Sequence, residues 1–375
     1  MVREYRRAAH ANNTHATYST AGRRYSAFGE KFGIRALFPA TDDLLCEFAS
    51  YLAHTEHLTY GTIKGYLFGI RSIQLDMGMD FPAMRERYPV HQTLKGIRRK
   101  IGDCSKPKMP VTVPILKQFA RTVRTKRADP AQRVRWGAIW AAVLVGFFGM
   151  LRKDNLTKGK QTAFNNQQGL TREDVRLHDA TAGRRAVLWL RIRYSKTNQT
   201  QGEPLVIPVA ATGDELCPVE AVRTHMAETK SGSSDNLFLT KGEGPRGGQL
   251  KPLTHAVLVS GIKELAKAAG MDPAAYAGHS LRRGGATMAF QMGVSSHLIK
   301  QQGNWKSDAV FLYHQLSVAD RLRLPTLMAQ KVAQKAAGAS QARCELDGRS
   351  STDGYVLEAG VSQRQLRFGG LASHF

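Results

Sequence analysis

A histidine and an arginine in the last third of the chain have the types and the spacing that suit chemistry on a phosphate group. His279 and Arg282 are three residues apart, so on a helix they share one face. The small residues Gly284, Gly285 and Ala286 follow, and they let another backbone or a ligand approach closely. A guanidinium can bind two phosphate oxygens at once, and an imidazole beside it can donate a hydrogen bond or move a proton.

A tryptophan and a tyrosine complete this set further along the sequence. Trp305 lies 26 residues beyond the histidine, and Tyr313 lies another eight residues on. Ser307 can cap a short helix predicted over residues 307–316, and Asp308 suits its first turn. That predicted helix presents Tyr313.

Two further basic residues precede this set, each in a distinctive local sequence. Arg152 follows a long apolar stretch, predicted as a buried helix over residues 132–151, within the segment GFFGMLRKDNL. Lys196 stands in the polar turn YSKT of a predicted β-hairpin, whose return strand covers residues 205–209. Apolar residues occupy every second position of the first strand of this hairpin, at Leu188, Leu190 and Ile192.

Taken together and in this order, these segments resemble the tyrosine recombinase (lambda integrase) family. H-x-x-R, G-x-W and a tyrosine in a short helix are similar to its C-terminal motifs, and GFFGMLRKDNL resembles the segment with its first catalytic arginine. YSKT resembles the turn with its hairpin lysine, and LTREDV, residues 170–175, looks like the strand after the first arginine. The resemblance covers about residues 113–328. Trp305, where many members carry histidine, is most similar to the Cre-type branch, and the motifs also resemble recombinases of eukaryotic mobile elements.

The resemblance implies an enzyme with six catalytic residues, which are Arg152, Lys196, His279, Arg282, Trp305 and Tyr313. The two arginines, the histidine and the indole N–H would hold a DNA phosphate while the tyrosine attacks it. The lysine would protonate the leaving 5′-oxygen. The 3′-phosphotyrosine would store the bond energy, so no ATP, metal or other cofactor is implied.

The sequence departs from the family pattern at three places. Tyr313 follows Trp305 by eight residues where nine are common, and one residue turns a helix face by about 100°. Asn155 stands where members often carry an acidic residue, and the loop over residues 157–169 is long. Tyr276 and Tyr194 are alternative nucleophiles, both in less suitable places.

The composition indicates a globular protein with a polyanionic partner. Lys and Arg total 54 against 30 Asp and Glu, a formal net charge of +24, and nucleic acid is the commonest partner of so basic a chain. The 4 cysteines are far apart, and His54 and His57 have no third ligand nearby, so we predict neither disulfides nor a metal site. The longest apolar run, residues 138–151, is too short to span a membrane, and the Arg-rich N-terminus lacks an apolar signal segment.

The predicted fold is mainly α with a small β-hairpin or sheet. Residues 1–105 read as a helical core-binding domain, residues 106–113 as an extended proline-rich linker, residues 114–337 as a mixed α/β catalytic domain and residues 338–375 as a flexible tail. The resemblance implies a C-shaped clamp around duplex DNA. In the first domain the predicted DNA-binding residues are Lys64, Arg71, Lys95, Arg98, Arg99 and Lys100.

The resemblance implies a site-specific recombinase acting on double-stranded DNA as a homotetramer on two target sites. We nominate residues 322–332 as a segment that docks on a neighbouring subunit. A protein with this substrate belongs in the nucleus of a eukaryote, where residues 95–100 or 121–127 could act as import signals, or otherwise in the cytoplasm, and not outside the cell. The alternatives are a type IB topoisomerase-like strand transferase, a recombinase-derived DNA-binding protein without catalysis, and an unrelated RNA-binding protein.

Overall fold

The computed structural model describes residues 1, 5, 9, 12–103, 107–157, 169–193, 203–241, 248–313, 325–326 and 328–330. Two compact units, Met1–Gly284 and Gly285–Phe375, divide the chain, and the boundary falls inside a helix. No helix in these described ranges is long and apolar enough to cross a bilayer.

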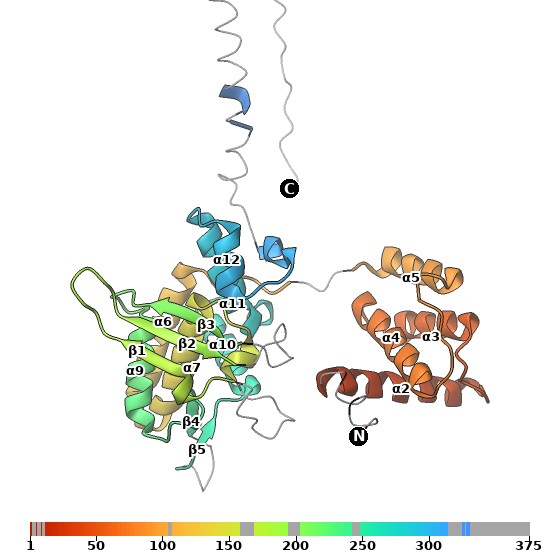
Figure 1. Cartoon of the computed structure of the whole chain (residues 1–375), viewed down its shortest axis with the longest axis horizontal. Helices are drawn as coiled ribbons and strands as arrows, with labels where there is room; N and C mark the ends of the chain where they lie inside the picture. Colours follow the sequence, from red (N-terminus) through yellow and green to blue (C-terminus); the bar gives the residue numbers. More distant parts are fainter. Residues whose placement is uncertain are drawn as a thin grey trace, which may run out of the picture. The chain divides into compact units, whose positions relative to one another are not determined.

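The N-terminal helices surround a hydrophobic core of their own, and Figure 1 shows them as one bundle. Tyr25, Phe28 and Phe48 lie at its centre, with the ring centroids of Tyr25 and Phe48 4.9 Å apart. Thr41 caps the helix that follows it, because its hydroxyl accepts a hydrogen bond from the Leu44 N–H at 3.3 Å. The helices are α2 (Asn12–Phe32), α3 (Asp42–His54), α4 (Tyr60–Asp76) and α5 (Tyr88–Ile101).

The rest of the described chain is mainly helical with a small amount of β-structure, which confirms the predicted fold class. Its helices are α6 (Val113–Ala128), α7 (Pro130–Phe148), α8 (Lys153–Leu156), α9 (Pro218–Thr229), α10 (His255–Ala268), α11 (Gly278–Gln291) and α12 (Ser296–Gly303). Short 3₁₀ helices are η1 (Arg172–Asp174), η2 (Pro273–Ala275) and η3 (Asp308–Tyr313). The strands are β1 (Val175–His178), β2 (Val187–Ile192), β3 (Leu205–Ala210), β4 (Leu239–Lys241) and β5 (Leu250–Pro252).

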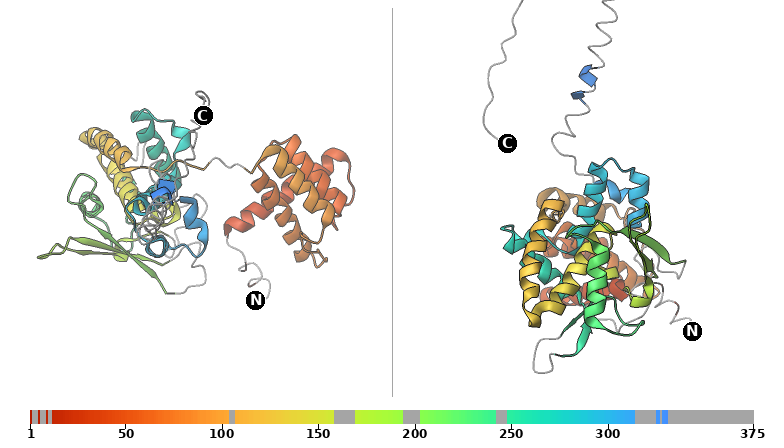
Figure 2. Two further views of the ribbon diagram at one scale, coloured as in Figure 1. Left: turned by 90° about the horizontal axis from the view of Figure 1, so that it is seen from above. Right: turned by 90° about the vertical axis from the view of Figure 1, so that its left-hand side faces the viewer.

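The predicted hairpin forms the larger part of an antiparallel sheet with the order β1-β2-β3. Leu188 pairs with Val209 and Leu190 with Ile207, and these four side chains are buried on one face. Figure 2 shows the sheet as a layer at one side of α6 and α7. The period-two pattern in the sequence therefore identified the strand and its buried face correctly.

The segment LTREDV is only in part the strand that the resemblance implies. The strand begins at Val175, and residues 172–174 form η1 instead. Asp174 accepts hydrogen bonds from the backbone N–H and the hydroxyl of Thr171, at 3.0 and 2.9 Å, so a capping box fixes a tight turn before the strand.

Helix α7 is the buried helix predicted from the apolar run, but it is shorter at its C-terminal end. It ends at Phe148 rather than at residue 151, and Gly149 follows as its C-cap. Met150 then has a left-handed backbone with φ of 49°, which turns the chain sharply. Arg152 lies beyond this turn, at the N-cap of α8, so it does not compensate the dipole of the apolar helix.

A buried histidine joins α9 to β4 and makes stability depend on pH. The Nε2 atom of His225 accepts a hydrogen bond from the Leu239 N–H at 3.1 Å, so the ring is neutral with its proton on Nδ1. Burial, reinforced by the charges of Arg172 and Arg127, lowers the pKa of His225 to about 4. Protonation would turn Nε2 into an N–H donor, which would face the N–H donor of Leu239.

We therefore expect the unfolding free energy to fall by about 3 kcal/mol as the pH drops from the ordinary histidine pKa of 6.5 to about 4, because the unfolded state then binds more protons. Urea unfolding followed by circular dichroism across this range measures the effect. His225→Gln keeps an acceptor for the Leu239 N–H but does not titrate, so its stability should change less over the same range. If the unfolding free energy of the two proteins falls equally with pH, His225 is not the group responsible.

Gly284 lies where α11 meets the extended residues 107–112, which precede α6. A Cβ atom at this position would stand 1.9 Å from the Val111 carbonyl oxygen and 2.9 Å from the Phe147 ring. This agrees with the expectation that the small residues after Arg282 allow another backbone to approach. The predicted linker is thus in close contact with a helix rather than surrounded by solvent at this point.

Replacing Gly284 with alanine should therefore lower the unfolding free energy by about 3 kcal/mol or more, since either the helix or residue 111 must move. Gly96 provides the control, because it lies inside α5 with nothing within 4 Å of an added Cβ. Gly96→Ala should raise stability by about 0.5–1 kcal/mol. Urea midpoints that fall equally in both variants, or in neither, would show that the close approach is not maintained in solution.

Candidate active site

Arg282 is fixed at the buried side of α11 by the turn that follows α7. Its side chain is 2% exposed, and its Nη1 atom donates a hydrogen bond to the Met150 carbonyl oxygen. Met150 stands two residues before Arg152. The turn that contains Met150 therefore holds the side chain of Arg282 and also leads directly into Arg152. The sequence did not indicate this role of Met150, although a left-handed residue after an apolar helix is itself unusual.

His279 lies within the electrostatic reach of both candidate arginines. Partial loss of water around the ring, and then the positive charges of Arg282, Arg283 and Arg152, lower the pKa of His279 from its usual value. The ring is therefore neutral near neutral pH and can donate one hydrogen bond without adding charge. The structure thus brings together three of the six predicted catalytic residues, Arg152, His279 and Arg282.

Trp305 and Tyr313 belong to the second compact unit. Trp305 is 8% exposed, and its ring lies across Gly303, where a Cβ atom would stand 1.7 Å from Cζ3 of the indole. The glycine of the G-x-W motif is thus required by the tryptophan that follows it. Asn304 between them has a left-handed backbone with φ of 53°, which ends α12.

A helix is predicted over residues 307–316. Its described part is wound more tightly than an α-helix. Asp308–Tyr313 is a 3₁₀ helix, in which each residue turns the chain by about 120° instead of 100°. Asp308 forms an ion pair with Lys300 at 2.9 Å, and Val310 is fully buried.

Lys196 lies outside the described residues, but the end of the strand that leads to it is well fixed. Asp174, whose side chain is fully buried, pairs with Arg193 at 2.7 Å and with Arg191 at 3.1 Å. Arg193 is the last described residue before the hairpin turn. Asp174 is therefore a supporting residue that the sequence reasoning missed, and its capping-box position beside Thr171 was the available signal.

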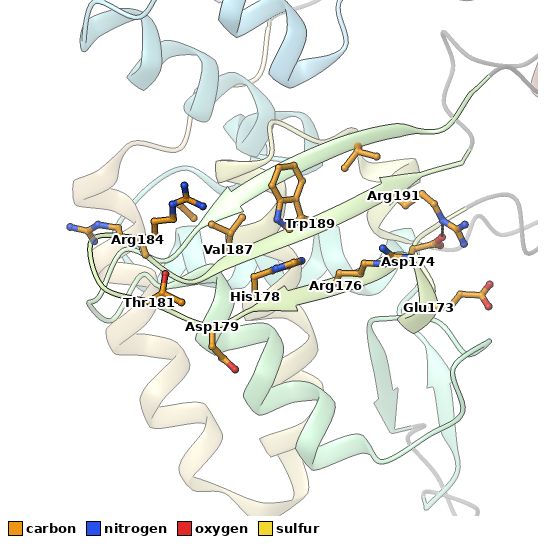
Figure 3. A pocket seen from close by; sticks show the side chains of 13 residues that line it. Glu173, Asp174, Arg176, His178, Asp179, Thr181, Arg184, Val187, Trp189 and Arg191 are labelled. Carbon is orange, nitrogen blue, oxygen red and sulfur yellow. Dashed lines mark hydrogen bonds and ion pairs between the residues drawn. The ribbon is translucent and has the colours of Figure 1, made fainter.

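The outer face of the sheet is hollowed. Figure 3 shows Trp189 and His178 on this face, with Arg176 beside them and the ion pair of Asp174 and Arg191 at one end. Among the described candidate residues of the same compact unit, neither Arg152, His279 nor Arg282 lines this hollow.

The predicted DNA-binding residues occupy two neighbouring helices of the N-terminal bundle. Lys64 and Arg71 are on α4, and the others are on α5, where Lys95, Arg99 and Lys100 are exposed. Arg98 is exposed too, but it forms an ion pair with Asp103 at 2.6 Å and lies over the ring of Tyr60. Its charge is therefore partly neutralised.

Comparison with known proteins supports the resemblance. No family model matches the chain. An integrase/recombinase xerD homolog from Selenomonas ruminantium is 26% identical over 222 residues, 58% of this chain and 57% of that relative, so the chain spans little more than half of the relative's length. The structure of the XerH site-specific recombinase in a post-cleavage complex matches with a TM-score of 0.57 at 18% identity, covering 84% of this chain and 78% of that one. The Tn1549 transposon integrase matches with a TM-score of 0.52 at 15% identity, covering 85% and 94%.

The two structural matches establish the tyrosine recombinase fold. The xerD homolog adds sequence similarity to an integrase/recombinase over 58% of this chain.

Proposed function

We propose that this protein is a site-specific recombinase that cleaves and rejoins double-stranded DNA through a 3′-phosphotyrosine intermediate. The observation that carries the proposal is the position of Arg282, which lies on the same helix as His279 and is bonded to the Met150 carbonyl two residues before Arg152, in a chain with a net charge of +24. Cations gathered around a neutral imidazole suit a phosphodiester, whose oxygens gain negative charge in the transition state.

In the proposed reaction, Arg152 and Arg282 bind the nonbridging oxygens of the scissile phosphate. The Tyr313 oxygen loses its proton and forms a bond to phosphorus, while the bond from phosphorus to the 5′-oxygen breaks. Lys196 gives the leaving oxygen a proton. Attack by another 5′-hydroxyl reverses these steps, so rejoining needs no external energy source.

His279 and Trp305 would complete the binding of the phosphate in this proposal. The neutral imidazole donates one hydrogen bond, and the indole N–H can only donate. Both are therefore suited to an oxygen that becomes more negative during the reaction, without adding charge to the site.

The N-terminal helices would supply most of the affinity for the DNA backbone. Lys64, Lys95, Arg99 and Lys100 are exposed on α4 and α5. Each phosphate that they neutralise would release counterions, which favours binding at low salt. Arg98 should contribute less, because Asp103 already shares its charge.

The relatives suggest the kind of assembly. XerH is described bound to a palindromic difH substrate, and the Tn1549 integrase in complex with transposon right end DNA. By analogy, this chain would act on a specific duplex site, as a homotetramer on two such sites. Most of residues 322–332, nominated for docking on a neighbour, lie outside the described residues.

A protein with this activity would work in the nucleus of a eukaryote or in the cytoplasm of a prokaryote. Residues 95–100 would be the better import signal, since Lys95, Arg99 and Lys100 are exposed. In residues 121–127, Arg124, Lys126 and Arg127 form ion pairs with glutamates.

Trapping on nicked DNA tests the proposal. Purified protein is incubated with a pool of end-labelled duplexes, each nicked just 3′ of a candidate scissile phosphate, and run on a denaturing gel. Loss of the short 5′-hydroxyl fragment should leave a protease-sensitive adduct on the strand that ends in a 3′-phosphate. Tight binding without any adduct would favour a DNA-binding relic. Site-independent relaxation of supercoils would favour a topoisomerase.

A further inference from the structure

The extended residues 107–112, which we call the strap, are hydrogen-bonded along the segment that begins α11. The Met109 N–H donates to the Ala275 carbonyl at 2.8 Å, and the Val111 N–H donates to the Ser280 carbonyl at 3.0 Å. Pro110 stands between the two donors and has no N–H of its own. The proline-rich sequence thus keeps the strap extended and loses no hydrogen bond that this pairing needs.

Two side chains reinforce the backbone contacts at the same place. The Lys108 Nζ donates to the Ala274 carbonyl at 2.6 Å, and the Arg283 Nη1 donates to the Lys108 carbonyl at 3.1 Å. Arg283 is only 6% exposed, although it is charged. A guanidinium this buried depends on the hydrogen bonds that it makes, and one of them goes to the strap.

The strap contacts a different face of α11 from the one that bears the candidate catalytic residues. Ser280, Arg283 and Gly284 follow the three-and-four spacing of one helix face, whereas His279 and Arg282 are centred about 120° around the axis. On its own side, Arg282 is bonded to the Met150 carbonyl. The start of α11 is therefore held from two sides, by the Met150 turn and by the strap.

We propose that the strap is a positioning element for the reaction, and that Arg283 is a positioning residue that acts through α11 on His279 and Arg282. This inference rests on the proposed function, because it assigns the strap a role in DNA cleavage. A shift of about 1 Å in a group that binds the transition state can slow a reaction about 100-fold. A strap fastened at four points limits such a shift.

The strap is also the covalent connection from α5 to α6. Residues that join the proposed DNA-binding helices to the catalytic part are the same residues that are bonded to α11.

The test compares Arg283→Lys and Lys108→Met with the wild-type protein. Arg283→Lys keeps the positive charge near His279 but loses the planar guanidinium that reaches the strap. Lys108→Met removes the exposed anchor to Ala274. Lys263→Met on α10 is the matched control, because it removes the same surface charge away from the strap.

Two readouts are needed, one of them independent of catalysis. Hydrogen exchange of the amides of residues 278–284 should be faster in both strap variants and unchanged in the control. On nicked duplexes, the first-order rate of adduct formation should fall about tenfold to 100-fold in Arg283→Lys, with DNA affinity within about twofold of wild type. Its pH profile should match that of the wild type, since the charge beside His279 is kept.

The outcomes separate the proposals. A wild-type rate in Arg283→Lys would overturn the positioning role, and unchanged exchange in both variants would overturn the strap itself. If Arg283→Lys does not fold, Lys108→Met decides by the same two readouts. If the wild-type protein forms no adduct on any duplex, the proposed function fails and the catalytic role of the strap fails with it. Hydrogen exchange would still show whether the strap holds α11.

Discussion

Replacing Tyr313 with phenylalanine is expected to abolish the covalent DNA adduct while leaving DNA binding intact. The substitution removes one oxygen atom, which in the proposed reaction forms the bond to phosphorus. Loss of a nucleophile cannot be compensated by the phosphate-binding residues, so the cleavage rate should fall by about 10⁴-fold or more. Denaturing gels of nicked, labelled duplexes measure the adduct, and gel shifts of the same duplexes measure binding.

Tyr276→Phe is the matched control for this experiment. Tyr276 is 7% exposed, and burial raises the pKa of its hydroxyl, which makes it harder to deprotonate and a poorer nucleophile. Its variant should form the adduct at nearly the wild-type rate, as should Tyr194→Phe. An adduct that survives Tyr313→Phe and disappears in either of these variants would move the nucleophile and invalidate the assignment of the last helix.

Replacing Arg282 with lysine should slow adduct formation by about 100-fold to 1,000-fold. The guanidinium presents several donors in one plane, so it can bond to the Met150 carbonyl and still offer donors to a phosphate. A lysine ammonium is a single point charge on a flexible stem, so it cannot bond to the Met150 carbonyl and to the phosphate at the same time. The single-turnover rate on a nicked duplex at saturating protein measures this effect.

Arg176→Lys controls for the general effect of exchanging an arginine. Arg176 is exposed on the outer face of the sheet, in the hollow that neither Arg152, His279 nor Arg282 lines. Its variant should cleave at the wild-type rate. Equal losses in both variants would mean that the effect on cleavage does not come from the site around Arg282.

The sequence predicted most of the secondary structure, because local patterns determine it. The alternation of Leu188, Leu190 and Ile192 identified a strand with one buried face, and the apolar stretch before Arg152 identified a buried helix. Where the prediction was wrong, the cause was a specific turn. The left-handed Met150 ends α7 early, and the capping box at Thr171 replaces the first part of a strand by η1.

Two supporting residues of the site could not be found in this way. Met150 and Arg283 matter through contacts with residues far away in the sequence, and each looks ordinary in its own segment. The strap shows this most clearly. Its prolines predicted an extended segment, but nothing local indicated that residues 108 and 111 would bond to residues 274–284.

By itself, the sequence determined the residue types and their order, from Arg152 to Tyr313, and hence the family resemblance and the expected chemistry. Only the tertiary structure decided that Arg282, on the same helix as His279, is bonded to the turn that precedes Arg152. The physical reason is the range of the interactions. Helix and strand patterns arise from residues a few positions apart, whereas the site is held by hydrogen bonds across more than 130 positions, such as that of Arg282 to Met150.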